Sequence, residues 1–143
     1  MAKYTGKPVT VPVGREELYE RVSNLGGLRE RLQALPPEAL AKVGDVEFID
    51  ADSFAINASG IGRVVFTVTE RVAPEKVVMS ANTGMVPLGL IIELESAGDG
   101  ATSLTSAIDV EIPMMLRPMV GGKMKEAADK FSEMIGRLNG YQG

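Results

Sequence analysis

Residues 112–139 read IPMMLRPMVGGKMKEAADKFSEMIGRLN, and this stretch decides the fold. At about 100° per residue, its apolar side chains fall within an arc of about 100°, which predicts an amphipathic helix packed against another part of the chain. Pro118 fits the first turn, where its missing N–H needs no partner, and Asn139–Gly140 supplies the stop. The regular helix is therefore expected to begin near Leu116 or Arg117. The apolar stripe consists of Leu116, Val120, Met124, Ala127, Phe131, Met134, Ile135 and Leu138.

Methionines gather where this helix begins. Four of the chain's eight methionines lie between Met114 and Met124. Methionine has flexible torsions and a polarisable sulfur, so it fills irregular apolar space and repacks around ligands of different shape. We expect the segment to cover an apolar cavity between the helix and the rest of the fold. A solidly packed core is the alternative interpretation.

Gly121–Gly122 lie inside the predicted helix, where each glycine costs about 1 kcal/mol relative to alanine. Two explanations are open. A flexible first turn would let residues 115–119 move as a gate. Close packing against Gly26–Gly27 would also require glycine, but without any motion.

The N-terminal part of the chain predicts a strand followed by two short helices. Residues 4–13 alternate in polarity and are β-branched in their second half, which is typical of a strand. Gly14 is expected to cap the first helix. Gly26–Gly27 is expected to break that helix, and Pro36–Pro37 to stop the second one.

From Val43 the hydrophobic period changes to two, which predicts strands. Their connections are short and rich in Gly, Asp and Pro, so successive strands are expected to form an antiparallel meander. One helix can cover such a sheet only when the sheet curls around it. We therefore predict a single α+β domain over residues 1–143, a seven-stranded curved antiparallel sheet around a long C-terminal helix, with two short helices after the first strand. The later strands are expected at about 44–50, 53–58, 63–72, 76–82, 88–96 and 102–111.

Composition removes several classes of function. The chain has no cysteine and no histidine, which excludes thiol catalysis, disulfides and the side chain best suited to proton transfer near neutral pH. A net charge of −4 without clustered Lys or Arg argues against a nucleic-acid partner. No apolar run is long enough for a transmembrane helix and no signal peptide is visible, so the cytoplasm is the expected location. No metal or cofactor is predicted, since the acidic stretch at residues 43–52 lacks the spacing of a calcium loop.

Three stretches carry a resemblance to a known superfamily: PVTVPVGREELYERVSNLGGL at residues 8–28, ERVAPEKVVMSA at residues 70–81, and the C-terminal helix. With this order of elements, nearly the whole chain resembles the START/SRPBCC superfamily. The resemblance implies the helix-grip fold of polyketide cyclases, coenzyme-Q-binding proteins and plant pollen allergens, with a pocket between sheet and helix. It implies no reaction, because the superfamily has no shared catalytic motif. Many members carry an aromatic residue soon after the first helix, where this chain has Leu28.

We expect the pocket to bind or transport a small hydrophobic molecule, such as a lipid, quinone or polycyclic compound, by burying apolar surface. A polyketide cyclase- or dehydratase-like enzyme is an alternative, with Glu70 and Tyr19 as its candidate acid–base residues. A ligand-free module that binds a protein partner is another. Alternation along the strand directs Glu93 and Glu95 away from the core, so these acids are expected to face water. The residues expected to line the pocket are Phe48, Phe66, Met79, Ile92, Met115, Met119, Met124 and Phe131.

Overall fold

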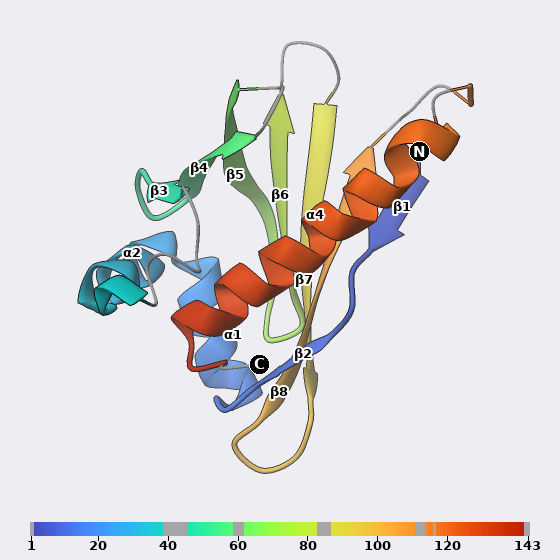
Figure 1. The fold of residues 1–143 in the computed structure, drawn as a ribbon. Helices are drawn as coiled ribbons and strands as arrows, with labels where there is room; N and C mark the ends of the chain where they lie inside the picture. Colours follow the sequence, from blue (N-terminus) through green and yellow to red (C-terminus); the bar gives the residue numbers. More distant parts are fainter. Residues whose placement is uncertain are drawn as a thin grey trace.

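The computed structural model describes residues 2–38, 46–58, 62–82, 87–110, 114–115 and 117–141. In these residues, antiparallel strands form one sheet in the order β1-β8-β7-β6-β5-β4-β3, with β2 also pairing β8. The long helix α4 crosses one face of the sheet diagonally, and α1 and α2 lie toward one end of it (Figure 1). The elements are β1 (Ala2–Thr5), β2 (Val9–Val11), α1 (Arg15–Ser23), α2 (Leu25–Ala34), β3 (Val46–Phe48), β4 (Ser53–Ala58), β5 (Gly62–Val72), β6 (Lys76–Asn82), β7 (Pro87–Ser96), β8 (Thr102–Val110) and α4 (Arg117–Leu138).

The opening strand, expected over residues 4–13, is two strands that share one neighbour. β1 pairs with β8 as far as Thr5↔Ala107, and β2 resumes the pairing at Val9↔Leu104. Residues 6–8 therefore oppose only residues 105–106, which makes a bulge. The sheet thus has seven positions with β1 and β2 sharing one of them, and the predicted α+β architecture, a curved antiparallel sheet around a long C-terminal helix, is confirmed.

The bulge brings the backbone of the first strand onto α4. A Cβ added to Gly6 would lie 2.7 Å from the backbone nitrogen of Asp129, so the close approach requires glycine. The Lys7 N–H donates to Asp129 Oδ1 (2.5 Å). The N–H of Ser106, which lies opposite the bulge, donates to Ser132 Oγ (2.9 Å). α4 is therefore hydrogen-bonded into the gap between β1 and β2.

The chain's four phenylalanines form one group, the phenylalanine cluster of Phe48, Phe54, Phe66 and Phe131. Phe131 of α4 stands edge-on to Phe54 and Phe66, with ring centroids 6.2 and 5.4 Å away. Phe54 also contacts Phe66 at 5.3 Å and Phe48 at 5.8 Å. Aromatic pairs at such distances contribute about 0.5–1.5 kcal/mol each beyond the burial of their area. Through Phe131, α4 packs against Phe54 of β4 and Phe66 of β5, and Phe48 of β3 packs against Phe54.

The apolar stripe predicted for α4 is confirmed over the C-terminal half of the helix. The helix begins at Arg117, as expected, and stops before Gly140, whose φ of 99° lets the Tyr141 N–H donate back into the last turn (2.9 Å). Leu116 and the side chain of Val120 lie outside the described residues, as do the expected strand residues 44, 45 and 111. Of the remaining members, Met124 and Ala127 are half-buried, and Phe131, Met134, Ile135 and Leu138 are buried.

The break between the two short helices is not at Gly26–Gly27. α1 ends at Ser23, Asn24 is extended (φ −119°) and α2 begins at Leu25, so both glycines lie in the first turn of α2. The Leu25 N–H donates to the Ala51 oxygen (2.9 Å). This tertiary hydrogen bond and the burial of Leu25 fix the break earlier than the glycine pair indicates.

Open space surrounds Gly122. A Cβ added there would meet nothing within 4 Å, so close packing does not explain this glycine. The gate formed by a flexible first turn stays a prediction.

We expect Gly6→Ala to lower the free energy of unfolding by about 2 kcal/mol, because the new methyl group would overlap the backbone of α4. Gly122→Ala is the matched control and should raise it by about 0.5–1 kcal/mol, since alanine favours the helix and meets no neighbour. Urea denaturation followed by circular dichroism measures both changes. Equal effects at the two positions would contradict the close approach at Gly6.

Candidate functional site

Five of the eight residues expected to line a pocket are buried in the core, with exposed fractions of 7% or lower. Phe48, Phe66 and Phe131 belong to the phenylalanine cluster. Met79 and Ile92 lie on the inner face of β6 and β7, the face that α4 covers. The structure therefore brings these five side chains into one hydrophobic core between sheet and helix.

The three remaining pocket residues are methionines at the start of α4, and they differ. Met124 is half-buried and packs against the core. Met115 is 89% exposed, because it lies in the turn that precedes α4 rather than on the helix. The side chain of Met119 lies outside the described residues. Of these three methionines, Met124 is the one whose side chain the structure shows packed against the core.

Beside the phenylalanine cluster, a group of apolar side chains on the inner face is only half-buried. We call this group the inner apolar layer. It packs against the buried core, which includes Val64, Met79 and Leu90. Figure 1 shows that the start of β5 and the end of β6 reach beyond the diagonal helix. The layer consists of Val46, Ile56, Leu88, Met124 and Ala127.

Sequence reasoning missed the strand members of this layer. Val46, Ile56 and Leu88 each lie two residues from a buried apolar residue on the same strand, Phe48, Phe54 and Leu90. Since side chains two apart share a face of a strand, the alternation alone could have added them to the predicted lining.

Polar groups on the inner face are few and mostly used to hold the fold. Thr102, Ser106 and Ser132 are fully buried. Thr102 Oγ1 donates to the Val13 oxygen (2.7 Å), and Ser132 Oγ accepts from the Ser106 N–H. The Ser106 hydroxyl has no hydrogen-bond partner among the described residues. Among the described buried side chains of the inner face, the Ser106 hydroxyl is therefore the one without a partner.

Neither of the two candidate acid–base residues, Glu70 and Tyr19, is fully buried. Glu70 is exposed on β5, at a bulge where the pairing shifts between Val68 and Glu70. Tyr19 is half-buried on α1 and packs against the core. Glu70 forms no ion pair among the described residues.

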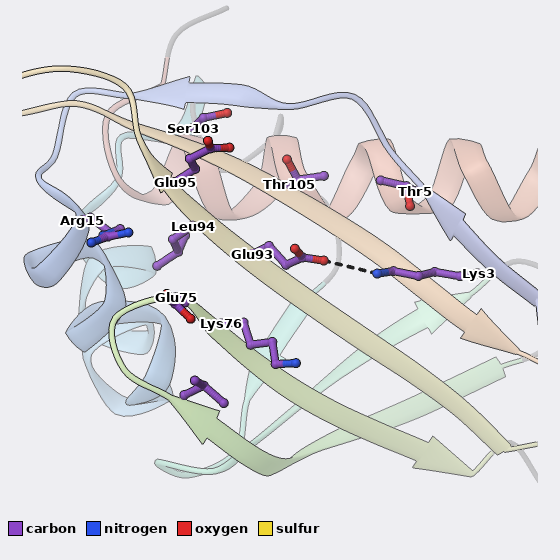
Figure 2. Close-up of a pocket in the computed structure, with 11 residues that line it drawn as sticks. Lys3, Thr5, Arg15, Glu75, Lys76, Glu93, Leu94, Glu95, Ser103 and Thr105 are labelled. Atoms are coloured by element: carbon purple, nitrogen blue, oxygen red, sulfur yellow. Dashed lines mark hydrogen bonds and ion pairs between the residues drawn. The ribbon is translucent and has the colours of Figure 1, made fainter.

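A polar cleft of about 740 Å³ lies on the outer face of the sheet, opposite α4. Figure 2 shows Arg15 at one end of it and Lys3 at the other, with Glu93 between them. Lys3 Nζ and Glu93 Oε1 form an ion pair of 3.3 Å. Glu93 and Glu95 face outward, as alternation predicted. The cleft is lined by Lys3, Thr5, Arg15, Val72, Glu75, Lys76, Glu93, Leu94, Glu95, Ser103 and Thr105.

The charges of this outer cleft balance. Three basic residues, Lys3, Arg15 and Lys76, face three glutamates at positions 75, 93 and 95. Apart from the Lys3–Glu93 pair, these groups make no ion pair within the described part of the chain. The cleft is suited to a ligand or surface that carries both signs of charge.

The described residues contain no group of three acidic side chains close enough to hold a metal ion. Nor do they contain a helix long and apolar enough to cross a membrane.

No protein-family model matches the chain, and no curated protein matches its sequence. Solved structures do. Truncated norcoclaurine synthase from Thalictrum flavum aligns with a TM-score of 0.68 at 11% identity, over 96% of this chain and 92% of that one. The Aha1 dimer from Colwellia psychrerythraea aligns with 0.59 at 13% over 100% of both chains. An HSP90 activator from Plasmodium falciparum aligns with 0.52 at 14%, over 87% of this chain and 90% of that one.

These likenesses show that the chain has the helix-grip fold. At such low identity they show the fold alone. The reaction or partner of each matched protein belongs to that protein.

We expect Ser132→Ala to lower the free energy of unfolding by about 1–3 kcal/mol, because the buried Ser106 N–H would lose its acceptor. Ser106→Ala is the matched control. It removes a hydroxyl without a partner, so it should cause no loss and a gain of up to about 1 kcal/mol. Thermal and urea denaturation of both variants measure the difference. A large loss from Ser106→Ala would mean that the hydroxyl is hydrogen-bonded after all.

Proposed function

We propose that the protein binds a small hydrophobic molecule between its sheet and the N-terminal half of α4. The observation that carries this proposal is the inner apolar layer, whose half-buried side chains pack against the buried core and keep apolar surface exposed. Covering the remaining apolar surface contributes about 25 cal/mol for each Å² removed from water. The phenylalanine cluster occupies the space farther along the helix and bounds the site on that side.

The chemistry of the layer favours an uncharged ligand such as a lipid, quinone or polycyclic compound. The side chains are Val, Ile, Leu, Met and Ala, and none of them is polar. The strand carboxylates Glu93 and Glu95 face the opposite side of the sheet. A charged ligand would therefore lose its hydration without gaining a partner.

One further point supports a site for a small molecule, and a second favours a binding protein over a cyclase-like enzyme. A solved neighbour, norcoclaurine synthase, has been crystallised in complex with dopamine and hydroxybenzaldehyde, so a protein of this fold accommodates small aromatic molecules. The candidate acid–base residue Glu70 is exposed, and the sequence contains no histidine. Acid–base catalysis is most often performed by histidine, whose pKa lies near neutral pH, and this chain has none.

We expect Leu88→Trp to weaken binding of the fluorescent probe N-phenyl-1-naphthylamine by about tenfold or more, because the indole would fill space over the inner apolar layer. Ile91→Trp is the matched control, since it places the same side chain on the opposite face of the same strand. A fluorescence titration of the delipidated protein measures both affinities. Organic extraction of the purified protein, followed by mass spectrometry, should identify the native ligand.

Two results would contradict the proposal. One is a wild-type protein that neither binds the probe nor releases an apolar compound on extraction. The other is an equal loss of probe affinity in Leu88→Trp and Ile91→Trp, which would remove the inner face as the site.

A second candidate is a module that binds a protein, and the outer cleft is the observation that favours it. Arg15 and Lys76 line the cleft without an ion pair among the described residues, and such groups can complement charges of a partner. Two solved neighbours are named Aha1 and HSP90 activator.

On this second candidate, the purified protein should stimulate the ATPase of an Hsp90-type chaperone. Arg15→Glu/Lys76→Glu should reduce that stimulation by about tenfold, because like charges would then meet across the interface. Lys130→Glu, on the exposed side of α4, serves as the control and should leave it unchanged. Absence of stimulation by the wild-type protein would reject this candidate and leave the ligand-binding proposal untouched.

A further inference from the structure

Two adjacent methionines are almost fully exposed. Met114 and Met115, the methionine tip, form the turn before α4, and their exposed fractions are 78% and 89%. The other exposed large apolar side chains of the described residues, Ile49 and Val65, reach only 39% and 38%. Exposed apolar side chains that adjoin one another mark contact sites more often than scattered ones do. The methionine tip is therefore a candidate for docking.

Figure 1 places this turn at an outer corner of the molecule, where α4 begins. A projecting corner can lie against a broad surface. Methionine also suits a surface without fixed shape, because its side chain is flexible and polarisable.

The start of α4 is basic, whereas the chain as a whole is acidic. The chain carries a net charge of −4, yet residues 112–125 include Arg117, Lys123 and Lys125 and no acidic residue. Lys123 and Lys125 are exposed, and neither forms an ion pair within the described residues. The helix dipole does not account for this, since it favours acidic side chains in a first turn, and α4 has none there.

We propose that the methionine tip docks the protein on an anionic lipid bilayer. The two methionines enter the interfacial region, and the ammonium groups of Lys123 and Lys125 contact lipid phosphates. Apolar insertion and a basic flank are the two contributions that hold a peripheral protein on such a surface. This docking goes beyond ligand binding and holds whether or not the inner apolar layer takes a ligand.

Vesicle flotation with the purified full chain tests the proposal. The protein should float with vesicles that contain roughly 30% phosphatidylglycerol, but not with pure phosphatidylcholine, because the basic flank requires anionic lipid. Met114→Ser/Met115→Ser should lower the partition coefficient by about tenfold. Lys123→Gln/Lys125→Gln should lower it by a similar factor and reduce its dependence on salt.

Ile49→Ser/Val65→Ser is the matched control, since it removes the other exposed apolar side chains from a different part of the surface and should leave flotation unchanged. Circular dichroism and the probe titration should show that all three double variants remain folded and retain the ligand site, so failure of docking is distinguishable from failure of ligand binding.

Three outcomes overturn the proposal. The wild-type protein does not float with anionic vesicles, or flotation survives Met114→Ser/Met115→Ser. Alternatively, light scattering shows a dimer in solution that the methionine substitutions dissolve, which would assign the tip to a second copy of the chain.

Discussion

The structure depends on an interruption of the first strand. Between β1 and β2 the chain bulges, and Gly6 places its backbone directly against α4. A bulge removes strand hydrogen bonds, and buried backbone groups need replacements. Asp129 and Ser132 provide them from the helix, by accepting from the N–H groups of Lys7 and Ser106. The sheet therefore holds the helix by directional hydrogen bonds as well as by apolar contact.

That attachment decides which sides of α4 meet which strands. Ser132 faces β8 and the bulge, so Phe131, next to it, turns toward β4 and β5 and enters the phenylalanine cluster. The C-terminal half of the helix is thus closed on two sides. Earlier on the helix, Met124 and Ala127 are only half-buried. The inner apolar layer therefore lies beside the N-terminal half of α4, away from the contacts of Phe131 and Ser132.

Periodicity predicted most of this fold, because side chains that recur at the period of a helix or a strand lie on one face of that element. The helical stripe and the alternation along β7 both identify a buried face, and the structure confirms the alternation and, over the C-terminal half of α4, the stripe. The bulge was not predicted, although Gly6 and Pro8 inside an expected strand are residues typical of a bulge. Nothing local identifies the helix backbone that lies beside Gly6. The break between α1 and α2 was predicted at Gly26–Gly27 but lies at Asn24. The Leu25 N–H donates to the Ala51 oxygen, a tertiary contact that the local sequence does not indicate.

The candidate site was less predictable than the fold. Residue type identified the side of each strand that faces the core. It could not show which of those side chains are fully buried and which keep exposed surface. Phe48, Phe66 and Phe131 proved to be in ring contact with one another or with Phe54, whereas Ile56 and Leu88 kept exposed surface. The outer cleft depends on the pairing of β1 with β8, two strands that are far apart in sequence.

The same attachment also bears on whether the interior can support catalysis. A reaction in the inner site would need polar groups free to act on a substrate. Thr102 is bonded to the Val13 oxygen, and Ser132 is occupied by the Ser106 N–H. The one unpartnered buried hydroxyl of the described inner face is that of Ser106, and a lone hydroxyl is a weak nucleophile without an adjacent base. Of the buried hydroxyl groups in the described interior, those of Thr102 and Ser132 therefore serve the fold, and the Ser132 hydroxyl does so by holding α4 to β8.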